Sequence, residues 1–410
     1  MRLLAFAALF LAIPLTALAQ DEQRGIDVVD VSGPLDSSAL EFMVDSIEQA
    51  SEDGQELVLL QIDSRAVLDA TTYERLVEVL AEPPLPVAVW VGPAPAEAYG
   101  GAALLLEVPS YAAIAPGSTI GLTNPVVLGG EAVPGSAPDL QFEDEVVAAE
   151  ETGFELQPTL RQYLQDLDGR TFDTAAGQVV VSTVREFGDG VTLRDVTFRK
   201  PGLLTRFFRL AVIPEAAFFF LVIGLSVVTF EFFALGPGVA AGVAALSLLP
   251  AGWGLVNLPT RWWGLLMVIL GWGLLTAAYQ KGGYVVMTAV GTILLQLGGM
   301  ALIDGSGQID PRWWLIFPSV LAVLFFFLIA MPTVQRARLS TQTIGRGSLV
   351  GREGYALVDF DHEGLVEVDG ARWRATAHRE AALDIGSPIV VTGVDGLYLE
   401  VEPLESDREN

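Results

Sequence analysis

Between residues 26 and 127, short apolar runs alternate with stretches in which apolar residues recur at helical spacing. The runs Leu57–Ile62 and Val87–Val91 are typical of buried strands. Each run follows a helix pattern with one apolar face, formed first by Leu40, Met43, Val44 and Ile47 and then by Tyr73, Leu76, Val77 and Leu80. Strands separated by helices of this length predict an α/β domain. Residues 128–198 carry a weaker pattern, in which a helix is predicted around Leu160–Leu167.

Long apolar segments follow and predict a transmembrane domain over residues 199–335. Four of them are long enough, at about 1.5 Å per residue, to cross about 30 Å of hydrocarbon: Ile213–Phe233, Trp262–Tyr279, Tyr284–Ile303 and Trp313–Met331. A fifth candidate, Val239–Val256, is interrupted by Pro250. Tryptophan pairs at 262–263 and 313–314 stand where interfacial aromatic belts occur. The pattern therefore predicts a bundle of about five transmembrane helices.

The first residues have the order of a secretory signal: Arg2, an apolar run, and the small-residue site Ala17-Leu18-Ala19. We expect residues 1–19 to be a signal peptide and residues 20–198 to be exported; a retained N-terminal anchor is the alternative. Five crossings from the plasma membrane's outer side place the C-terminus in the cytoplasm. Arginines after the last helix agree with this orientation, whereas the basic residues before the first helix disagree: Arg199, Lys200, Arg206 and Arg209. The signal has more weight, because long translocated domains follow the charge rule poorly.

The C-terminal part, residues 343–405, has the pattern of a small all-β barrel. Five strand candidates are separated by turns such as Asp369-Gly370 and Asp395-Gly396: Gly354–Phe360, Gly364–Val368, Arg372–Ala377, Pro388–Thr392 and Tyr398–Val401. Five short strands fit an OB-fold. Because side chains alternate along a strand, Trp373 is predicted to be buried and the arginines on both sides of it to be exposed.

Charge divides the chain into the same three parts. Half of the residues are hydrophobic (51%) and the mean hydropathy is +0.47, which excludes a purely cytosolic enzyme. The formal charge of −27 is concentrated in residues 20–198, at −25, and in residues 343–410, at −8, whereas residues 201–342 carry +3. Acidic soluble parts repel phosphate backbones, so we expect no nucleic-acid partner.

Missing residue types limit the chemistry of the exported part. The chain has no cysteine, its histidines are His362 and His378, and Lys200 is its first lysine. Residues 1–199 therefore hold no histidine for a Ser-His-Asp triad or a metal site and no amine base. Arginine stays protonated and cannot replace such a base. We predict neither a metal site nor a cofactor.

Several polar residues have a functional and a structural interpretation. Ser118 is a candidate nucleophile, but a Gly-Ser-Thr turn after a proline is more typical of a structural role. The acidic group Glu143, Asp144, Glu145, Glu150 and Glu151 could collect calcium, but it lacks the turn glycine of such loops, so a solvated segment is favoured. Glu231 in a membrane helix is a candidate functional group or a packing group beside Gly236-Pro237-Gly238. The two histidines are candidates for pH sensing, with exposed positions as the favoured account.

Three groups of residues resemble the NfeD family in its long form. They are 114–121 (IAPGSTIG) with 124–126 (NPV), 230–232 (FEF) with 236–238 (GPG), and 349–354 (LVGREG) with 368–370 (VDG) and 372–375 (RWRA). The resemblance covers nearly the whole chain and implies the fold class: a multidomain membrane protein with a ClpP/crotonase-like α/β domain, a helical transmembrane bundle and a C-terminal OB-fold.

Members of this family with protease activity carry a serine in a small-residue segment, a glycine pair after a strand and a downstream lysine base. These groups would supply the nucleophile, charge stabilisation and proton removal of serine catalysis. Aligned by the surrounding residues, the serine position is Tyr99, and the family's Asp-Thr-Pro-Gly-Gly corresponds to Asp63 followed by Ser64, Arg65, Ala66 and Val67. The lysine has no counterpart. The resemblance thus implies a degenerate site with no catalytic residue, in which Ser64 and Tyr99 either line a peptide-binding cleft or only pack.

Our interpretation is a non-catalytic, membrane-anchored scaffold. The resemblance implies a stomatin/flotillin-type membrane protein as partner and a role in membrane organisation or quality control. The lipid bilayer is the second expected partner, and a homo-oligomer is left open. A membrane-bound ClpP-class serine protease with a displaced site is the alternative from the enzyme class. A transporter or channel subunit is disfavoured, because the membrane segments hold few charges.

Overall fold

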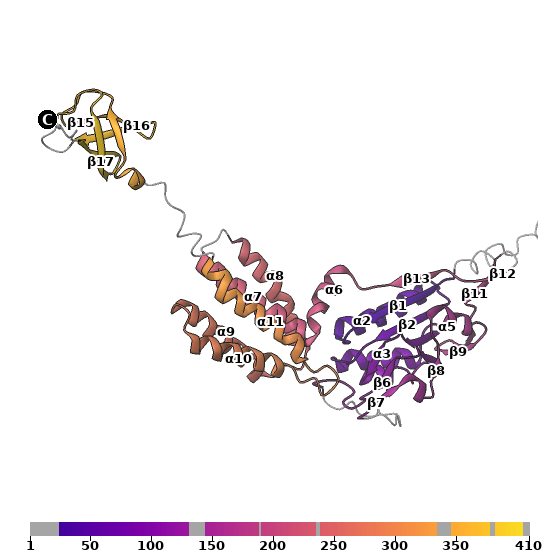
Figure 1. The fold of residues 1–410 in the computed structure, drawn as a ribbon. Helices are drawn as coiled ribbons and strands as arrows, with labels where there is room; N and C mark the ends of the chain where they lie inside the picture. The colour runs from indigo at the N-terminus through magenta and orange to yellow at the C-terminus, as the bar shows by residue number, and fades with distance from the viewer. Residues whose placement is uncertain are drawn as a thin grey trace, which may run out of the picture. The chain divides into compact units, whose positions relative to one another are not determined.

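The computed structural model describes residues 24–130, 144–187, 190–234, 238–333, 346–377 and 382–404 (Figure 1). The predicted signal peptide and His378 lie outside these residues. The chain forms two compact units, one ending at Met331 and the other beginning at Pro332, and each is described separately.

The first unit contains an α/β domain around a six-stranded parallel sheet. The strand order is β13 (Val196–Arg199), β1 (Ile26–Ser32), β2 (Leu57–Asp63), β3 (Val87–Val91), β5 (Tyr111–Ile114) and β8 (Glu155–Leu156). Both predicted strands are therefore confirmed. Alternation along β2 buries Val58, Leu60 and Ile62 in one apolar cluster and Leu57 and Leu59 in another, because successive side chains point to opposite faces.

Helices α2 (Ser37–Glu52) and α3 (Ala70–Ala81) bury the predicted faces, apart from the half-buried Val77. Each begins at an aspartate whose side chain accepts a backbone N–H of the first turn: Asp36 from Ala39 and Asp69 from Thr72. The expected helix near residue 160 is α5 (Leu160–Asp166). Short hairpins pair β9 (Thr171–Thr174) with β10 (Gly177–Val180) and β11 (Val184–Phe187) with β12 (Gly190–Leu193).

A small second sheet joins β4 (Glu97–Tyr99), β6 (Thr119–Gly121) and β7 (Val146–Ala148). Directly after β4, the chain forms the short buried helix α4 (Gly101–Leu104). The sequence indicated a small-residue segment here without assigning it a strand. This sheet is important for the site because β4 places Glu97 and Tyr99 beside the carboxyl end of β2.

Within the described residues, four helices are long and apolar enough to cross a membrane: α7 (Pro214–Ala234), α8 (Val239–Asn257), α9 (Trp262–Gln280) and the helix that begins as α11 (Trp313–Phe325) and continues to Thr333. Helix α8 runs through Pro250 without a break, so the segment that the sequence marked as interrupted is a full-length helix. Helix α10 (Val285–Ala301) is shorter than the predicted 284–303. It starts after Gly282 and Gly283, both with positive φ, and Ile303 already pairs with Thr260.

Helices α9 and α10 pack with their backbones in close approach. Gly264 and Gly271 on α9, and Gly291 and Gly298 on α10, are each seven residues apart and buried. A Cβ on Gly271 would lie 2.8 Å from the Gly291 carbonyl oxygen, which leaves no room for a side chain. Small residues at such positions allow membrane helices to approach closely.

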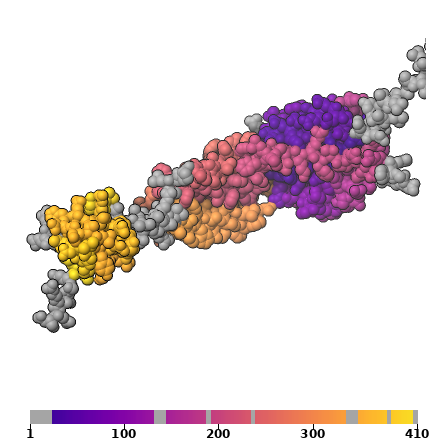
Figure 2. Space-filling view, turned by 90° about the horizontal axis from the view of Figure 1, so that it is seen from above, coloured from indigo at the N-terminus to yellow at the C-terminus, as the bar shows by residue number. Residues whose placement is uncertain are grey.

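Three of the four basic residues before α7 are bound to the α/β domain, whereas Arg206 donates to the nearby Pro201 carbonyl. Arg199 donates to Asp27 at 2.6 Å and to Asp53 at 2.7 Å, and Lys200 lies 3.0 Å from Asp30. Arg209, at the end of α6 (Leu203–Arg209), lies 3.2 Å from the fully buried Asp36 and donates to the Ser32 and Pro34 carbonyls. Figure 2 shows the helices packed directly against the α/β domain. Arg199, Lys200 and Arg209 therefore belong to structural pairs with the α/β domain.

The second unit is a closed five-stranded barrel with strand order β14-β15-β16-β18-β17. The strands are β14 (Glu353–Ala356), β15 (Glu363–Val368), β16 (Ala371–Ala377), β17 (Pro388–Asp395) and β18 (Tyr398–Pro403), so all five predicted strands and the OB-fold are confirmed. Asp369 and Gly370 both have positive φ, as a two-residue hairpin turn requires. Trp373 differs from expectation: it is half-buried against the core, and the fully buried position of this strand is Ala375.

Candidate functional site

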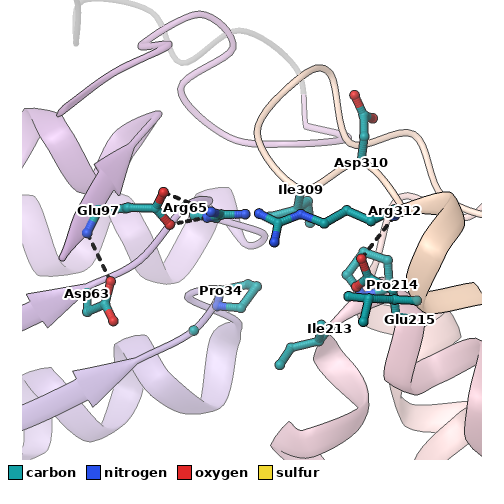
Figure 3. Close-up of a pocket in the computed structure, with 12 residues that line it drawn as sticks. Pro34, Asp63, Arg65, Glu97, Ile213, Pro214, Glu215, Ile309, Asp310 and Arg312 are labelled. Atoms are coloured by element: carbon teal, nitrogen blue, oxygen red, sulfur yellow. Dashed lines mark hydrogen bonds and ion pairs between the residues drawn. The ribbon is translucent and has the colours of Figure 1, made fainter. Parts of the chain in front are cut away.

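A pocket of about 260 Å³ lies where the carboxyl ends of β1 and β2 meet the first residues of α7 and α11 (Figure 3). The α/β domain contributes Gly33, Pro34, Asp63, Arg65 and Glu97, and the membrane domain contributes Ile213, Pro214, Glu215, Ile309, Asp310, Arg312 and Leu315. In open α/β sheets, ligands bind beyond the carboxyl ends of the strands. This pocket is therefore the candidate site.

Arg65, Glu97 and Tyr99 form a closed polar network beside the pocket. The Arg65 guanidinium binds both oxygens of the Glu97 carboxylate, one of them through Nη2 at 2.8 Å. The Tyr99 hydroxyl donates to Glu97 Oε1 at 3.1 Å and lies 3.0 Å from Thr119 Oγ1. The hydrogen bond from Arg65 lowers the pKa of Glu97, and burial raises the pKa of Tyr99. At neutral pH the network holds a carboxylate and a protonated phenol, and neither is a serine-type nucleophile with a base.

The other degenerate positions are buried. Ser64 is 1% exposed; its hydroxyl donates to the Ala66 carbonyl, and its backbone pairs with the Glu97–Tyr99 strand. Ala66 belongs to the apolar cluster of the membrane domain, and Val67 belongs to the core of the α/β domain. The structure thus brings Ser64, Arg65 and Tyr99 together, and it holds Ala66 and Val67 by packing.

Asp63 lines the pocket, and burial affects its pKa more strongly than the neighbouring charges and hydrogen bonds do. Its Oδ1 accepts the Glu97 backbone N–H at 3.0 Å, while Arg65 is held by Glu97. Burial therefore dominates and raises the pKa of Asp63 above its ordinary value. A carboxylate that folding disfavours in its charged form, placed in a pocket, marks a candidate binding group.

A loop of the membrane domain covers the segment next to Tyr99. Gln308 is 2% exposed, and its Nε2 donates to the Leu122 carbonyl at 2.8 Å and to the Pro125 carbonyl at 2.9 Å. A Cβ on Gly100 would lie 2.9 Å from Gln308 Oε1, so the carboxamide packs directly on this glycine. The membrane domain thereby occupies the space over the small-residue segment.

The remaining candidates have structural contacts. Ser118 is buried, and its Oγ accepts the Ala96 backbone N–H at 3.1 Å. Glu231 accepts the Gly238 backbone N–H at 3.0 Å, next to the start of α8, which agrees with its packing interpretation. Glu150 accepts the backbone N–H of Gly117, while Glu143 lies outside the described residues. His362 is exposed. Among the described residues, no group of three or more acidic or histidine side chains is placed to hold a metal ion.

Sequence reasoning missed Glu97, Gln308 and Arg312, which close or line the site. Their partners lie far away in the chain, and Gln308 is 186 residues from Leu122. The sequence did offer one signal for this part of the site. Charged residues are few in the membrane domain, and Asp310 and Arg312 stand together between two predicted helices.

Two family models match the chain. The NfeD integral membrane domain matches residues 215–331, and the NfeD-like C-terminal, partner-binding domain matches residues 346–403. With the α/β domain before them, these define a membrane protein with two folded parts outside its helices. The chain therefore carries both of the NfeD domains that these models describe.

Over nearly its whole length the chain is similar to the membrane-bound protease PH1510 of Pyrococcus horikoshii, at 22% identity, with 96% of this chain and 95% of that protein covered. A solved structure of the 1510-N membrane protease, specific for a stomatin homolog from Pyrococcus horikoshii, matches 45% of this chain and 97% of its own at 17% identity and a TM-score of 0.36. The C-terminal domain of the stomatin operon partner protein 1510-C from the same organism matches 15% of this chain and 98% of its own, at 25% identity and a TM-score of 0.15.

Proposed function

We propose that this protein is a non-catalytic membrane scaffold that binds a stomatin/flotillin-type protein in membrane organisation or quality control. The observation that carries the non-catalytic part is the absence of lysine and histidine from residues 1–199, together with Tyr99 bound in the Arg65–Glu97 network. Serine hydrolysis needs a base within hydrogen-bond reach of the nucleophile. The nearby hydroxyls of Ser64 and Ser118 are instead engaged with backbone groups.

The test of catalysis uses the full chain in mild detergent. We expect neither cleavage of apolar peptides nor labelling by a serine-reactive fluorophosphonate. Ser64→Ala and Ser118→Ala serve as matched variants. Stoichiometric labelling that disappears in either variant would establish the alternative, a protease with a displaced site, and would contradict the non-catalytic part of the proposal.

The partner part of the proposal is supported by the barrel, whose family description is partner-binding. The outward face of β14, β15 and β16 exposes Tyr355 (63%) and Leu365 (41%) next to charged residues. Exposed apolar side chains within a polar rim are typical of protein interfaces.

A pull-down from detergent-solubilised membranes tests the partner. We expect a stomatin-type protein to be captured by the intact chain and lost with Leu365→Glu, while Leu397→Glu, an exposed position at the β17–β18 turn (68%), retains it. Capture that is equal for both variants would move the interface away from this face, and absence of a stomatin-type protein would contradict the partner.

For topology, we propose an extracytoplasmic α/β domain and a cytoplasmic barrel. The ion pairs of Arg199, Lys200 and Arg209 support this topology. Because these cations are bound to carboxylates of the α/β domain, their positive charge is no evidence for a cytoplasmic position. Helix α10, with 17 residues, is about 26 Å long and falls slightly short of the hydrocarbon thickness. Its close packing on α9 supports a fifth crossing. A reporter after Asn410 should be active only as a cytoplasmic type and one near Gly135 only as an exported type; the same side for both would mean an even number of crossings.

A further inference from the structure

Helix α6, which stands between β13 and α7 in the chain, is amphipathic. At 3.6 residues per turn, its apolar side chains share one face and its polar side chains share the other. The apolar face consists of Leu203, Leu204, Phe207 and Phe208, and the polar face of Thr205, Arg206 and Arg209. Figure 1 shows α6 beside the ends of the membrane helices, where they meet the α/β domain. The helix therefore offers different chemistry to its two sides.

The polar face of α6 is fixed to the α/β domain. Arg209 lies 3.2 Å from the buried Asp36 and donates to the carbonyls of Ser32 and Pro34. Asp36 also caps α2, so this pair connects α6 to the first helix of the domain. The α/β domain thereby sets the rotation of α6 about its own axis and turns the apolar face away from the ion pair.

The apolar face is covered only in part. The ring of Phe208 lies 5.8 Å from that of Trp253 on α8, so this end of the face packs on the membrane domain. Leu203 is 80% exposed and Leu204 is 71% exposed. Two adjacent leucines beside packed aromatic rings form an apolar surface, which needs an apolar neighbour.

This surface continues into the face of α8 that meets lipid. Four exposed apolar side chains of α8 are spaced by three or four residues and therefore share one face: Leu246, Leu249, Trp253 and Val256. Because α8 is long and apolar enough to cross a membrane, its exposed apolar face is the one that lipid chains cover. Trp253 belongs to this face and contacts Phe208, so the apolar surface passes from α8 to α6 without a break.

The contact lies at the level of the membrane interface. Trp253 is four residues before Asn257, where α8 ends, and α9 begins with the exposed Trp262 and Trp263. Exposed tryptophans at helix ends mark the boundary between hydrocarbon and headgroups. Helix α6 therefore lies where an amphipathic helix meets the bilayer surface.

We propose that the apolar face of α6 lies in the interfacial layer of the bilayer, with Leu203 and Leu204 among the lipid chains next to the headgroups. Interfacial helices bury their apolar face about 5–10 Å into this layer. Through Arg209, the polar face then holds the α/β domain against the membrane surface. This attachment goes beyond the scaffold function, because it depends neither on the partner protein nor on the absence of catalysis.

The test uses the absence of cysteine from the chain, since a single introduced cysteine can carry a nitroxide spin label. The full chain is reconstituted in vesicles of phosphatidylcholine and phosphatidylglycerol. The accessibility of the label to oxygen, which concentrates in lipid, is compared with its accessibility to a nickel chelate, which stays in water. The ratio of oxygen to nickel accessibility should be severalfold higher at Leu204→Cys than at Arg206→Cys, an exposed position two residues away on the polar face.

Two further positions calibrate this ratio. Leu249→Cys, on the exposed face of α8, gives the value for lipid. Val180→Cys gives the value for water: it is 62% exposed on β10, and Figure 1 shows the paired strand β9 on the side of the α/β domain that is far from the membrane helices. In the chain labelled at position 204, Leu203→Glu should lower the ratio severalfold, because a carboxylate is drawn into water. Val180→Glu should leave it unchanged.

Each contrary result has a definite meaning. A ratio at Leu204 equal to that at Val180, or an unchanged ratio in Leu203→Glu, would place α6 in water and overturn the proposal. Low accessibility to both reagents, with dipolar broadening between labels, would show that a second copy of the chain covers the face and would overturn it as well. A label at Arg206 that matches the one at Leu249 would mean that the whole helix is immersed in lipid, which contradicts the interfacial position.

Discussion

At the junction between the α/β domain and the membrane helices, contacts join residues far apart in the chain: Gln308 binds carbonyls 183 and 186 residues away, and Arg209 binds one 177 residues away. In the barrel, β15 and β16 are joined by the two-residue turn Asp369-Gly370, and most neighbouring strands follow one another in sequence. The junction combines buried polar groups with an apolar cluster to which Ala66 and Leu128 of the α/β domain belong, whereas the barrel is fixed by alternating apolar side chains. The barrel should therefore fold by itself, while the α/β domain and the membrane helices should gain or lose stability together.

The largest effect should follow from removing the cation of the buried pair. Arg209→Met leaves the fully buried Asp36 without its positive partner and should lower the free energy of unfolding of the first unit by about 3–5 kcal/mol. Arg185→Met, at a pair that is 46% and 79% exposed, should change it by less than about 1 kcal/mol. Thermal unfolding of the full chain in detergent measures both. Equal effects of the two variants would contradict the importance of the junction.

Close helix packing supplies the next test. Gly271→Leu places a side chain where the α10 backbone lies and should cost about 3 kcal/mol. Gly273→Leu, two residues away on the same helix with nothing within 4 Å of the added Cβ, is the matched control and should be neutral or stabilising. Loss of the α9–α10 contact can be followed by protease sensitivity at the Lys281–Gly283 turn. In both variants the barrel should stay folded.

The barrel gives a smaller effect that sharpens the comparison. Expressed alone, residues 343–410 should give dispersed amide signals by NMR. Trp373→Ala should cost about 2 kcal/mol, less than the about 3–5 kcal/mol of a fully buried tryptophan, because this side chain is half-buried. Arg374→Ala, at an exposed neighbour, should cost little. A disordered isolated fragment would show that the barrel needs the rest of the chain or a partner.

The smallest effect concerns the pH dependence at the pocket. Because burial raises the folded-state pKa of Asp63, its contribution to stability is fully present below the ordinary pKa of 3.8 and is lost as pH rises through the raised value. Asp63→Asn should therefore stabilise the protein at pH 7, by less than about 1 kcal/mol, and have no effect near pH 3. Glu97→Gln should show the opposite sign at pH 7, since Arg65 lowers the pKa of Glu97 and the pair is lost as pH falls. Urea unfolding at several pH values measures both, and a stabilising Glu97→Gln would contradict the network.

The sequence by itself determined the parts whose stability comes from neighbours in the chain. The period of two in 354–401 and the turn Asp369-Gly370 predict the barrel, the apolar lengths predict the membrane helices, and the helical spacing of residues 40–47 predicts α2. In each case, a local backbone geometry repeats and buries every second or every third to fourth side chain. The missing lysine and histidine likewise limited the chemistry of the first domain without any structure.

Tertiary structure alone decided how the α/β domain and the membrane helices meet. No periodicity links Gln308 to Gly100, Arg209 to Asp36, or Arg312 to the pocket at the ends of β1 and β2. Such contacts are single polar pairs between distant segments, and their partners are set by how the domains pack. For the same reason the half-burial of Trp373 could not be read from strand alternation, which gives the side of the sheet on which a residue lies but not how deeply the barrel covers it.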